Sequence, residues 1–184
     1  MMKAIGPIGT ELEQALLKSF YVKQELKGEL LLLEGNISNR LWYLTNGVLR
    51  SFHEINERDV TSRIMYTGHI VISPGSFFTQ TPATESIEAL SDCTLAVLSY
   101  DLLQQIYSDF PEFNYHTRII TEQYFYKQEQ RLYMLRKHDA DAKYDYFLKH
   151  YANYLNDIPQ KYIASFLNIA PETLSRTRNK LRTK

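Results

Sequence analysis

The sequence predicts an α+β protein in which the strands come first and the helices last. Between residues 20 and 99, short apolar segments are separated by Gly, Asn, Ser or Asp, which is typical of a sandwich or barrel of short antiparallel strands. Residues 112–138 contain no Gly or Pro, which predicts one long helix. Residues 158–184 have the spacing of two further helices joined by a tight turn.

The composition excludes several classes of protein. The chain has 184 residues, 44% of them hydrophobic, and is long enough to bury a core. Its one cysteine, Cys93, rules out an intramolecular disulfide and a four-cysteine zinc or iron–sulfur site, and its apolar surroundings predict a small buried side chain. The N-terminus lacks the apolar run of a signal peptide, and no segment approaches the ~20 apolar residues of a membrane helix. We therefore expect a cytoplasmic protein with no membrane partner.

The histidines are isolated in the sequence. They are His53, His69, His116, His138 and His150. A metal or haem site needs clustered ligands, and the chain contains neither an H-x-H nor an H-E-x-x-H pattern. We therefore expect no metal, no cofactor and no enzymatic activity.

Cap and turn residues predict the shorter helices. Thr10 and Glu13 have the spacing of a capping box, which predicts a helix at the start of the chain. A second short helix is expected over residues 101–110, ended by Pro111.

A further helix and the domain boundaries follow from the polar residues after position 138. Asp139 and Asp141 are N-cap candidates for a helix that continues to about residue 155. The expected organisation is a β-domain over residues 1–111, a long helix over 112–138 and a small helical domain over 139–184.

The zero net charge of the chain hides an asymmetry. From Pro159 to Lys184 there are six basic residues and one acidic residue, a net charge of +5, so the rest of the chain carries −5. A basic end on an acidic body is typical of a protein that touches a polyanion with one part only. A solvated tail is the alternative.

The last two predicted helices have the residues of a tight helix–helix crossing. Ile163 and Leu167 lie on one face of the first helix, and the small Ala164 lets a second helix approach closely. Asn168 is expected at the corner, because Asn tolerates the left-handed conformation better than other non-glycine residues. The second helix is expected to begin at Ala170 or Pro171 and to turn leucines inward.

Glu172 and Arg176 are four residues apart near the start of this second helix. The major groove of DNA accepts an α-helix, in which Arg can pair with guanine and Glu can accept a hydrogen bond from cytosine. The alternative is an ordinary surface ion pair between the two side chains. Together with the crossing and the basic end, the pair predicts a DNA-reading helix.

These residues resemble the Crp/Fnr family of bacterial transcription regulators. The resemblance covers nearly the whole chain and rests on "IAxxLxIxxETLSR" near the end and on "KGELLLLEG", "LWYLTNGVLR" and "SIEAL" before it. It implies a cyclic-nucleotide-binding-like β-roll (a jelly-roll-like double-stranded β-helix), a dimerisation helix and a C-terminal helix-turn-helix. The implied function is sequence-specific binding to double-stranded DNA at a palindromic operator; activation would also require contact with RNA polymerase.

The resemblance also implies roles for individual residues. Glu172 and Arg176 would read bases. Phosphate or groove contacts are expected from Gln160, Lys161, Thr173, Arg178 and Lys180. The chain departs from the family where Pro171 replaces an Arg and Thr177 an apolar residue, and no β-hairpin wing follows the recognition helix.

The nucleotide cassette of the family is degenerate in this chain. Alignment places Ser73 at the Glu that holds the ribose, Ala83 at the Arg that holds the phosphate, and Thr84 at the neighbouring hydroxyl. A buried phosphate without a cation loses a charge-assisted interaction. We therefore expect another small-molecule effector in this pocket, or none, and not a cyclic nucleotide.

The long helix is expected to hold a homodimer together. Phe113, Ile120 and Tyr124 give it a partial apolar stripe, which is wide and not a strict heptad. Two recognition helices one DNA turn apart would match a palindrome. The remaining alternatives are packing of this stripe within one chain and a cupin-like β-roll sensor or scaffold that does not bind DNA.

Overall fold

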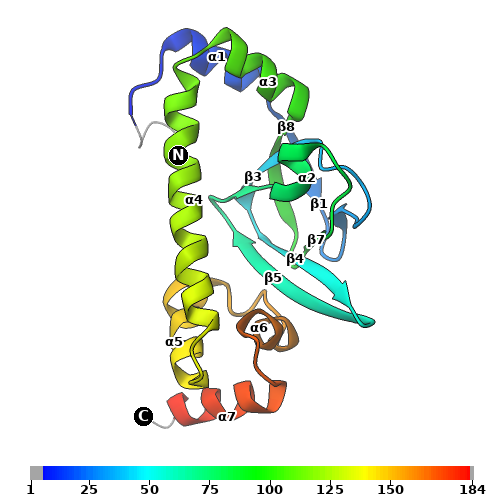
Figure 1. Cartoon of the computed structure of the whole chain (residues 1–184), viewed down its shortest axis with the longest axis vertical. Coiled ribbons are helices and arrows are strands. Elements are labelled where there is room, and N and C mark those ends of the chain that lie inside the picture. Colours follow the sequence, from blue (N-terminus) through cyan, green and yellow to red (C-terminus); the bar gives the residue numbers. More distant parts are fainter. Residues whose placement is uncertain (1–5, 183–184) are drawn as a thin grey trace.

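Two four-stranded antiparallel sheets face each other in the N-terminal half of the molecule (Figure 1). The computed structural model describes residues 6–182. In the first sheet the order is β1 (Tyr21–Glu25), β8 (Cys93–Ser99), β3 (Arg40–Asn46) and β6 (Ile70–Val71). In the second it is β2 (Leu30–Leu32), β7 (Ser86–Ala89), β4 (Val48–Ile55) and β5 (Arg58–Tyr66).

Helices precede, interrupt and follow this roll. They are α1 (Thr10–Ser19), α2 (Pro74–Thr79), α3 (Tyr100–Asp109), α4 (Phe113–Leu135), α5 (Ala140–Tyr151), a short 3₁₀ helix η2 (Ala152–Tyr154), α6 (Gln160–Leu167) and α7 (Pro171–Arg182). The mixed α+β class with antiparallel sheets agrees with the prediction. The six-residue α2 was not predicted; it follows Ser73 within the loop between β6 and β7.

Strand alternation sets the two faces of the first sheet. Trp42 and Leu44 of β3 lie in the core between the sheets, together with Leu95 of β8. Side chains at the alternate positions of these strands, such as Leu41 and Leu98, point to the outer face, where they contact α1 and α3. Cys93 is buried in the inner core, as predicted, and burial raises the pKa of its thiol.

The predicted capping box at the start of α1 is wrong. Thr10 is the first residue inside the helix, and Gly9 takes the N-cap position without a side-chain cap. The Glu13 N–H instead donates to the Gly9 carbonyl at 2.9 Å. The predicted cap of α5 is confirmed, because the Asp139 carboxylate accepts a hydrogen bond from the Asp141 N–H at 3.0 Å.

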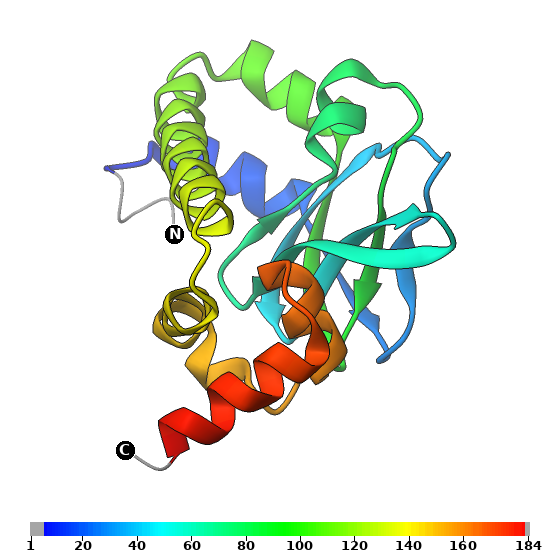
Figure 2. The same ribbon diagram turned by 60° about the horizontal axis from the view of Figure 1, so that its bottom comes forward.

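The long helix α4 runs along one side of the roll and connects it to the C-terminal helices (Figures 1 and 2). Its 23 residues span about 35 Å at a rise of 1.5 Å per residue. At its far end, α5 and α6 form an aromatic cluster in which Phe147 stacks on Tyr151 and Phe166 meets Tyr151 edge-on. The prediction of one uninterrupted helix over residues 112–138 is confirmed, except that the helix begins one residue later and ends three residues earlier.

The C-terminal helices are docked on the second sheet. One hydrophobic cluster joins Val48 and Ile64 of this sheet to buried residues of α5, α6 and α7. The Thr61 N–H donates to the Ser165 hydroxyl at 2.8 Å, across 104 residues of sequence. The roll and the C-terminal helices therefore share a core.

Candidate nucleic-acid interface and effector site

Two helices that meet at a sharp corner form the last part of the structure. The corner is Asn168, which has left-handed dihedral angles of φ 49° and ψ 56°, as predicted. Ala164 and Ile163 are buried beside it, and Leu174 of α7 is 1% exposed. The small side chain and the left-handed Asn thus let α7 begin at Pro171 and cross α6 closely.

The outer face of this helix pair carries the predicted DNA-contacting side chains. Glu172 and Arg176 are exposed on α7, and Gln160 and Lys161 are exposed at the start of α6. Figure 2 shows α7, in red, along the lower edge of the molecule. The structure thus leaves these four side chains free to meet a ligand from outside.

Arg176 bonds within its own helix. One of its guanidinium nitrogens donates to the half-buried Thr173 hydroxyl at 3.3 Å. Within the described part of the chain, Glu172 and Arg176 form no ion pair with each other. The surface-pair alternative is therefore not what this structure shows.

Lys180, which we predicted to contact phosphate or the groove of DNA, pairs with an acidic side chain in this structure. Its ammonium group pairs with the Asp141 carboxylate of α5, and this hydrogen bond raises the pKa of Lys180. Thr177 donates to the other oxygen of Asp141 at 3.0 Å, which satisfies a hydroxyl that is only 4% exposed. These contacts attach α7 to α5. Arg178 is half-buried, and Lys184 lies outside the described residues.

The three predicted effector residues lie near α2 but do not share one environment. Ser73 is the buried N-cap of α2, where its carbonyl accepts the Phe77 N–H at 2.7 Å. Ala83 is buried in the core between the sheets, whereas the Thr84 side chain is exposed. Thr84 therefore does not line an enclosed site together with the other two.

A largely buried ion pair, Arg63 with Glu85, lies in the roll. Arg63 and Glu85 face inward, because Met65 and Ile87, two positions further along the same strands, lie in the inner core. Their charged atoms are 2.6 Å apart, and the two side chains are 12% and 7% exposed. The sequence analysis did not identify this pair.

Every donor nitrogen of the Arg63 guanidinium is engaged. It donates to the Ser51 hydroxyl at 3.1 Å, the Ile72 carbonyl at 2.9 Å and the Tyr124 hydroxyl at 3.2 Å, besides Glu85. Tyr124 belongs to α4, so the network connects the interior of the roll to the long helix. We call this group of residues the roll network.

His69 lies in the turn between β5 and β6, against the Tyr66 ring and near Lys127 of α4. Burial, with a smaller contribution from Lys127, lowers its pKa from 6.5 to about 4. The unfolded chain therefore binds a proton between pH 6.5 and 4 that the folded chain does not, so stability falls as the pH falls through this window.

We expect this histidine to contribute a slope of up to about 1.4 kcal/mol per pH unit to the free energy of unfolding. Urea unfolding at pH 7, 6 and 5 measures the slope, and His69→Asn, which keeps an acceptor for the Tyr66 N–H, is the control. The variant should lose less stability between pH 7 and 5 than the parent; equal losses would contradict the assignment.

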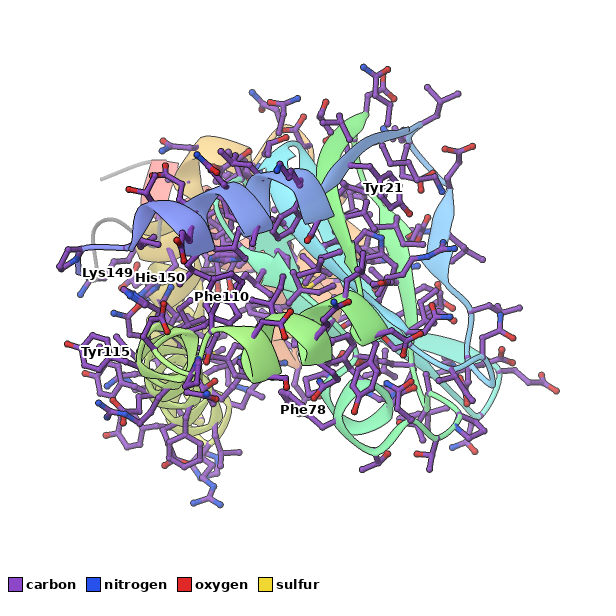
Figure 3. The ribbon with its side chains drawn as sticks, turned by 90° about the horizontal axis from the view of Figure 1, so that it is seen from above. Tyr21, Phe78, Phe110, Tyr115, Lys149 and His150 are labelled. Carbon is purple, nitrogen blue, oxygen red and sulfur yellow. The ribbon has the colours of Figure 1, made fainter. Side chains whose placement is uncertain are left out.

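The stripe predicted on α4 is divided between two surroundings. Phe113 is 4% exposed within its own chain, and Ile120 is half-buried, so Phe113 is not available to a partner helix. The exposed apolar side chains of α4 are instead Tyr115, Phe125, Tyr126, Leu132 and Tyr133, with Tyr124 at 37%. Figure 3 shows Tyr115 pointing away from the rest of the molecule.

No metal centre or membrane span accompanies these features. Within residues 6–182 no three His, Cys, Asp or Glu side chains are grouped so that they could hold a metal ion. In the same range no helix combines the length and apolar character needed to cross a bilayer.

The fold is an antiparallel β-roll followed by a long helix and further C-terminal helices. Residues 23–110 match the family model described as the cyclic nucleotide-binding domain, which is just under half of the chain. No curated protein sequence matches this chain.

Solved structures of similar fold cover more of the chain than the family model does. The c-di-GMP responsive global regulator CLP of Xanthomonas campestris is 16% identical, with a TM-score of 0.69 over 95% of this chain and 92% of its own. FixK2 of Bradyrhizobium japonicum is 16% identical, with a TM-score of 0.76 over 89% and 85%. Catabolite activator protein of Thermus thermophilus is 17% identical, with a TM-score of 0.58 over 96% and 84%. At these identities the likeness shows the fold alone, and it includes the helices that follow the roll.

Proposed function

We propose that this protein is a transcription regulator of the Crp/Fnr type, without enzymatic activity, that binds double-stranded DNA through α6 and α7. The observation that carries the proposal is the exposed face of α7, where Glu172 and Arg176 stand clear of the roll on a helix anchored by the left-handed Asn168. In this role α7 is the recognition helix of a helix-turn-helix, and a protein of this fold can present it to the major groove.

In this proposal the protein acts as a homodimer on a palindromic operator. Support comes from the exposed aromatic and leucine side chains on α4, because an apolar surface of this kind on a long helix favours a second copy. Of these exposed side chains, Tyr124 also contacts the roll, because its hydroxyl accepts a hydrogen bond from Arg63 at 3.2 Å.

We further propose that the regulator does not respond to a cyclic nucleotide. Neither Ser73 nor Ala83 carries a charge, and the Arg63 guanidinium, which donates to the carbonyl of the adjacent Ile72, is already paired with Glu85. A cyclic phosphate in the roll would have to displace this carboxylate or lie beside it. Like charges at that distance repel strongly in a buried site.

Two single substitutions test DNA reading. Selection of bound sequences from a random DNA pool should yield a palindrome with G·C in each half. On that DNA, Arg176→Ala should weaken binding about 5- to 150-fold and relax one G·C preference, because a bidentate pair to guanine is worth about 1–3 kcal/mol. Lys161→Ala should weaken all sequences alike and reduce the salt dependence.

The control for both variants is a measurement showing that they remain folded. Both side chains are exposed, so the thermal unfolding midpoint should change little. Unchanged DNA affinity in the folded Arg176→Ala protein would instead favour a sensor or scaffold that does not read DNA through α7.

A further inference from the structure

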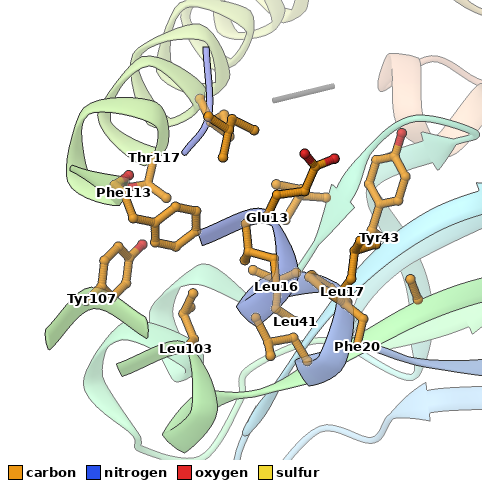
Figure 4. Close-up of a pocket in the computed structure, with 15 residues that line it drawn as sticks. Glu13, Leu16, Leu17, Phe20, Leu41, Tyr43, Leu103, Tyr107, Phe113 and Thr117 are labelled. Carbon is orange, nitrogen blue, oxygen red and sulfur yellow. Dashed lines mark hydrogen bonds between the residues drawn. The ribbon is translucent and has the colours of Figure 1, made fainter. Parts of the chain in front are cut away.

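A cavity outside the roll is not used by the proposed DNA binding. It has a volume of about 430 Å³ and lies on the outer face of the first sheet, between α1, α3 and the first half of α4 (Figure 4). Its walls include Leu16 of α1, Leu41 of β3, Ala96 and Leu98 of β8, and Phe113 and Ile120 of α4.

This cavity is separate from the interior of the roll. Leu41 and Leu98 point into it, whereas Trp42 and Val97, their neighbours along the same strands, point into the core between the sheets. A complete sheet thus stands between the cavity and the roll network. A ligand could occupy the cavity while the Arg63–Glu85 pair stays closed.

The lining fits an apolar small molecule. Pockets for small molecules have volumes of about 300–1,000 Å³ and are mostly apolar with a few polar groups, and this cavity has the same character. Protein interiors otherwise leave few voids larger than a water molecule. An apolar cavity gives water few partners and is therefore suited to an apolar ligand.

The polar groups at the rim restrict the charge of the ligand. Of the described residues that line the cavity, the only one with a charged side chain is Glu13, an acid, and none is Lys, Arg or His. Figure 4 shows its carboxylate directed away from the leucines of the cavity. Burying a charged group against this apolar lining would carry a desolvation cost, which disfavours fatty acids and phosphates.

Two tyrosines supply hydrogen-bonding capacity for an uncharged group. Tyr43 and Tyr107 both line the cavity, and neither hydroxyl has a hydrogen-bond partner among the described residues. Thr117, by contrast, already donates to the Phe113 carbonyl of its own helix at 3.1 Å. A ligand with one hydroxyl and an apolar body matches this arrangement.

We propose that the cavity binds a small uncharged apolar molecule, such as an alkyl or aryl alcohol, and that this molecule is the effector. Binding itself does not depend on the proposed DNA recognition, whereas the effector role does. The physical connection is α4: Phe113, Thr117 and Ile120 touch the cavity, and the same helix continues to the C-terminal helices. Filling the cavity therefore favours one position of α4 relative to the sheet.

Fluorescence of N-phenyl-1-naphthylamine, an uncharged probe that brightens in apolar surroundings, tests the site in the full chain without DNA. We expect saturable enhancement, displacement by 1-decanol, and displacement by decanoate at least tenfold weaker at pH 7.5. Absence of saturable enhancement, or equal displacement by the alcohol and the carboxylate, would overturn the proposal.

Ala96→Leu is the blocking variant, because its side chain would extend from β8 into the cavity; it should lower probe affinity at least tenfold. Ala152→Leu makes the same change at an exposed position of η2 and should bind normally. Thr117→Leu fills the cavity from α4 with a good helix former, which provides a second test if the strand variant does not fold. Normal probe binding by a folded blocking variant would assign the fluorescence to another surface and overturn the site.

The effector role is tested by measuring DNA affinity with and without 1-decanol. A shift of at least threefold in the parent and none in Ala96→Leu supports it. Probe binding without any shift in DNA affinity would overturn the effector role but not the site. Failure to bind DNA under either condition would count against the proposed function and leave the probe titration unaffected.

Discussion

Replacement of Arg50 by Ala is expected to lower the free energy of unfolding by about 3–5 kcal/mol, the cost of breaking a buried ion pair by removing one partner. Arg50 is on β4, and its side chain is 2% exposed. Its guanidinium contacts Glu88 at 2.6 Å and Asp59 at 2.7 Å. Loss of the cation would leave the Glu88 carboxylate, only 19% exposed, without a counter-charge.

The same guanidinium also connects the roll to α6. It lies between two aromatic rings, 4.0 Å from the centre of Phe52 on β4 and 3.6 Å from the centre of Tyr162 on α6. Cation–π contacts of this kind are worth about 0.5–2 kcal/mol, more when the cation is desolvated. Removal of Arg50 should therefore weaken the docking of the C-terminal helices as well as the roll.

Urea unfolding followed by circular dichroism measures the loss of stability, and hydrogen exchange of residues 160–167 measures the loosening of α6. Arg50→Lys should fall between the parent and Arg50→Ala, because an ammonium keeps the charge but not the planar stacking surface. Arg58→Ala removes an exposed arginine from the adjacent strand and should change stability by no more than about 0.5 kcal/mol. A loss below 1 kcal/mol in Arg50→Ala would contradict this account of the docking.

Features set by neighbouring residues could be predicted from the sequence. Asn168 adopts the left-handed corner because tolerance of that conformation is a property of the residue itself. The long α4 forms where the chain lacks helix breakers, and α5 is capped by Asp139 as expected. The start of α1 was predicted less well, since Gly9 and Thr10 are both acceptable caps and only tertiary packing selects between them.

Features set by distant residues could not be predicted in the same way. The Thr61–Ser165 hydrogen bond joins residues 104 apart, and Lys180 meets Asp141 across 39 residues. The face of α4 was ambiguous because aromatic residues occur all around this helix; only the position of the roll decides that Phe113 is internal.

One signal of the roll network was present in the sequence. Glu85 occupies the same alternating positions as Ile87 and Ala89, a pattern that turns its carboxylate inward with the apolar residues of β7, although we did not predict this. A buried carboxylate needs a cationic partner. The sequence nonetheless offers several arginines on the preceding strands, and the register of β4, β5 and β7 is needed to select Arg63.

Breaking the roll network is expected to have the second large effect. Glu85→Leu would leave the Arg63 guanidinium buried beside an apolar side chain. Arg63→Met would leave the Glu85 carboxylate, among the residues that the structure describes, with the Ser62 hydroxyl alone, at 3.4 Å. Each change should lower the free energy of unfolding by about 3–5 kcal/mol. Tyr124→Phe removes only the hydrogen bond to α4 and should cost about 1 kcal/mol.

The double variant Arg63→Met, Glu85→Leu separates the ion pair from the packing around it. Because it leaves no uncompensated charge inside the roll, its loss of stability should be well below the sum of the two single losses. Urea unfolding of the parent and three variants gives the coupling energy directly. Additive losses would mean that the two side chains act independently and would contradict the ion pair as the source of this stability.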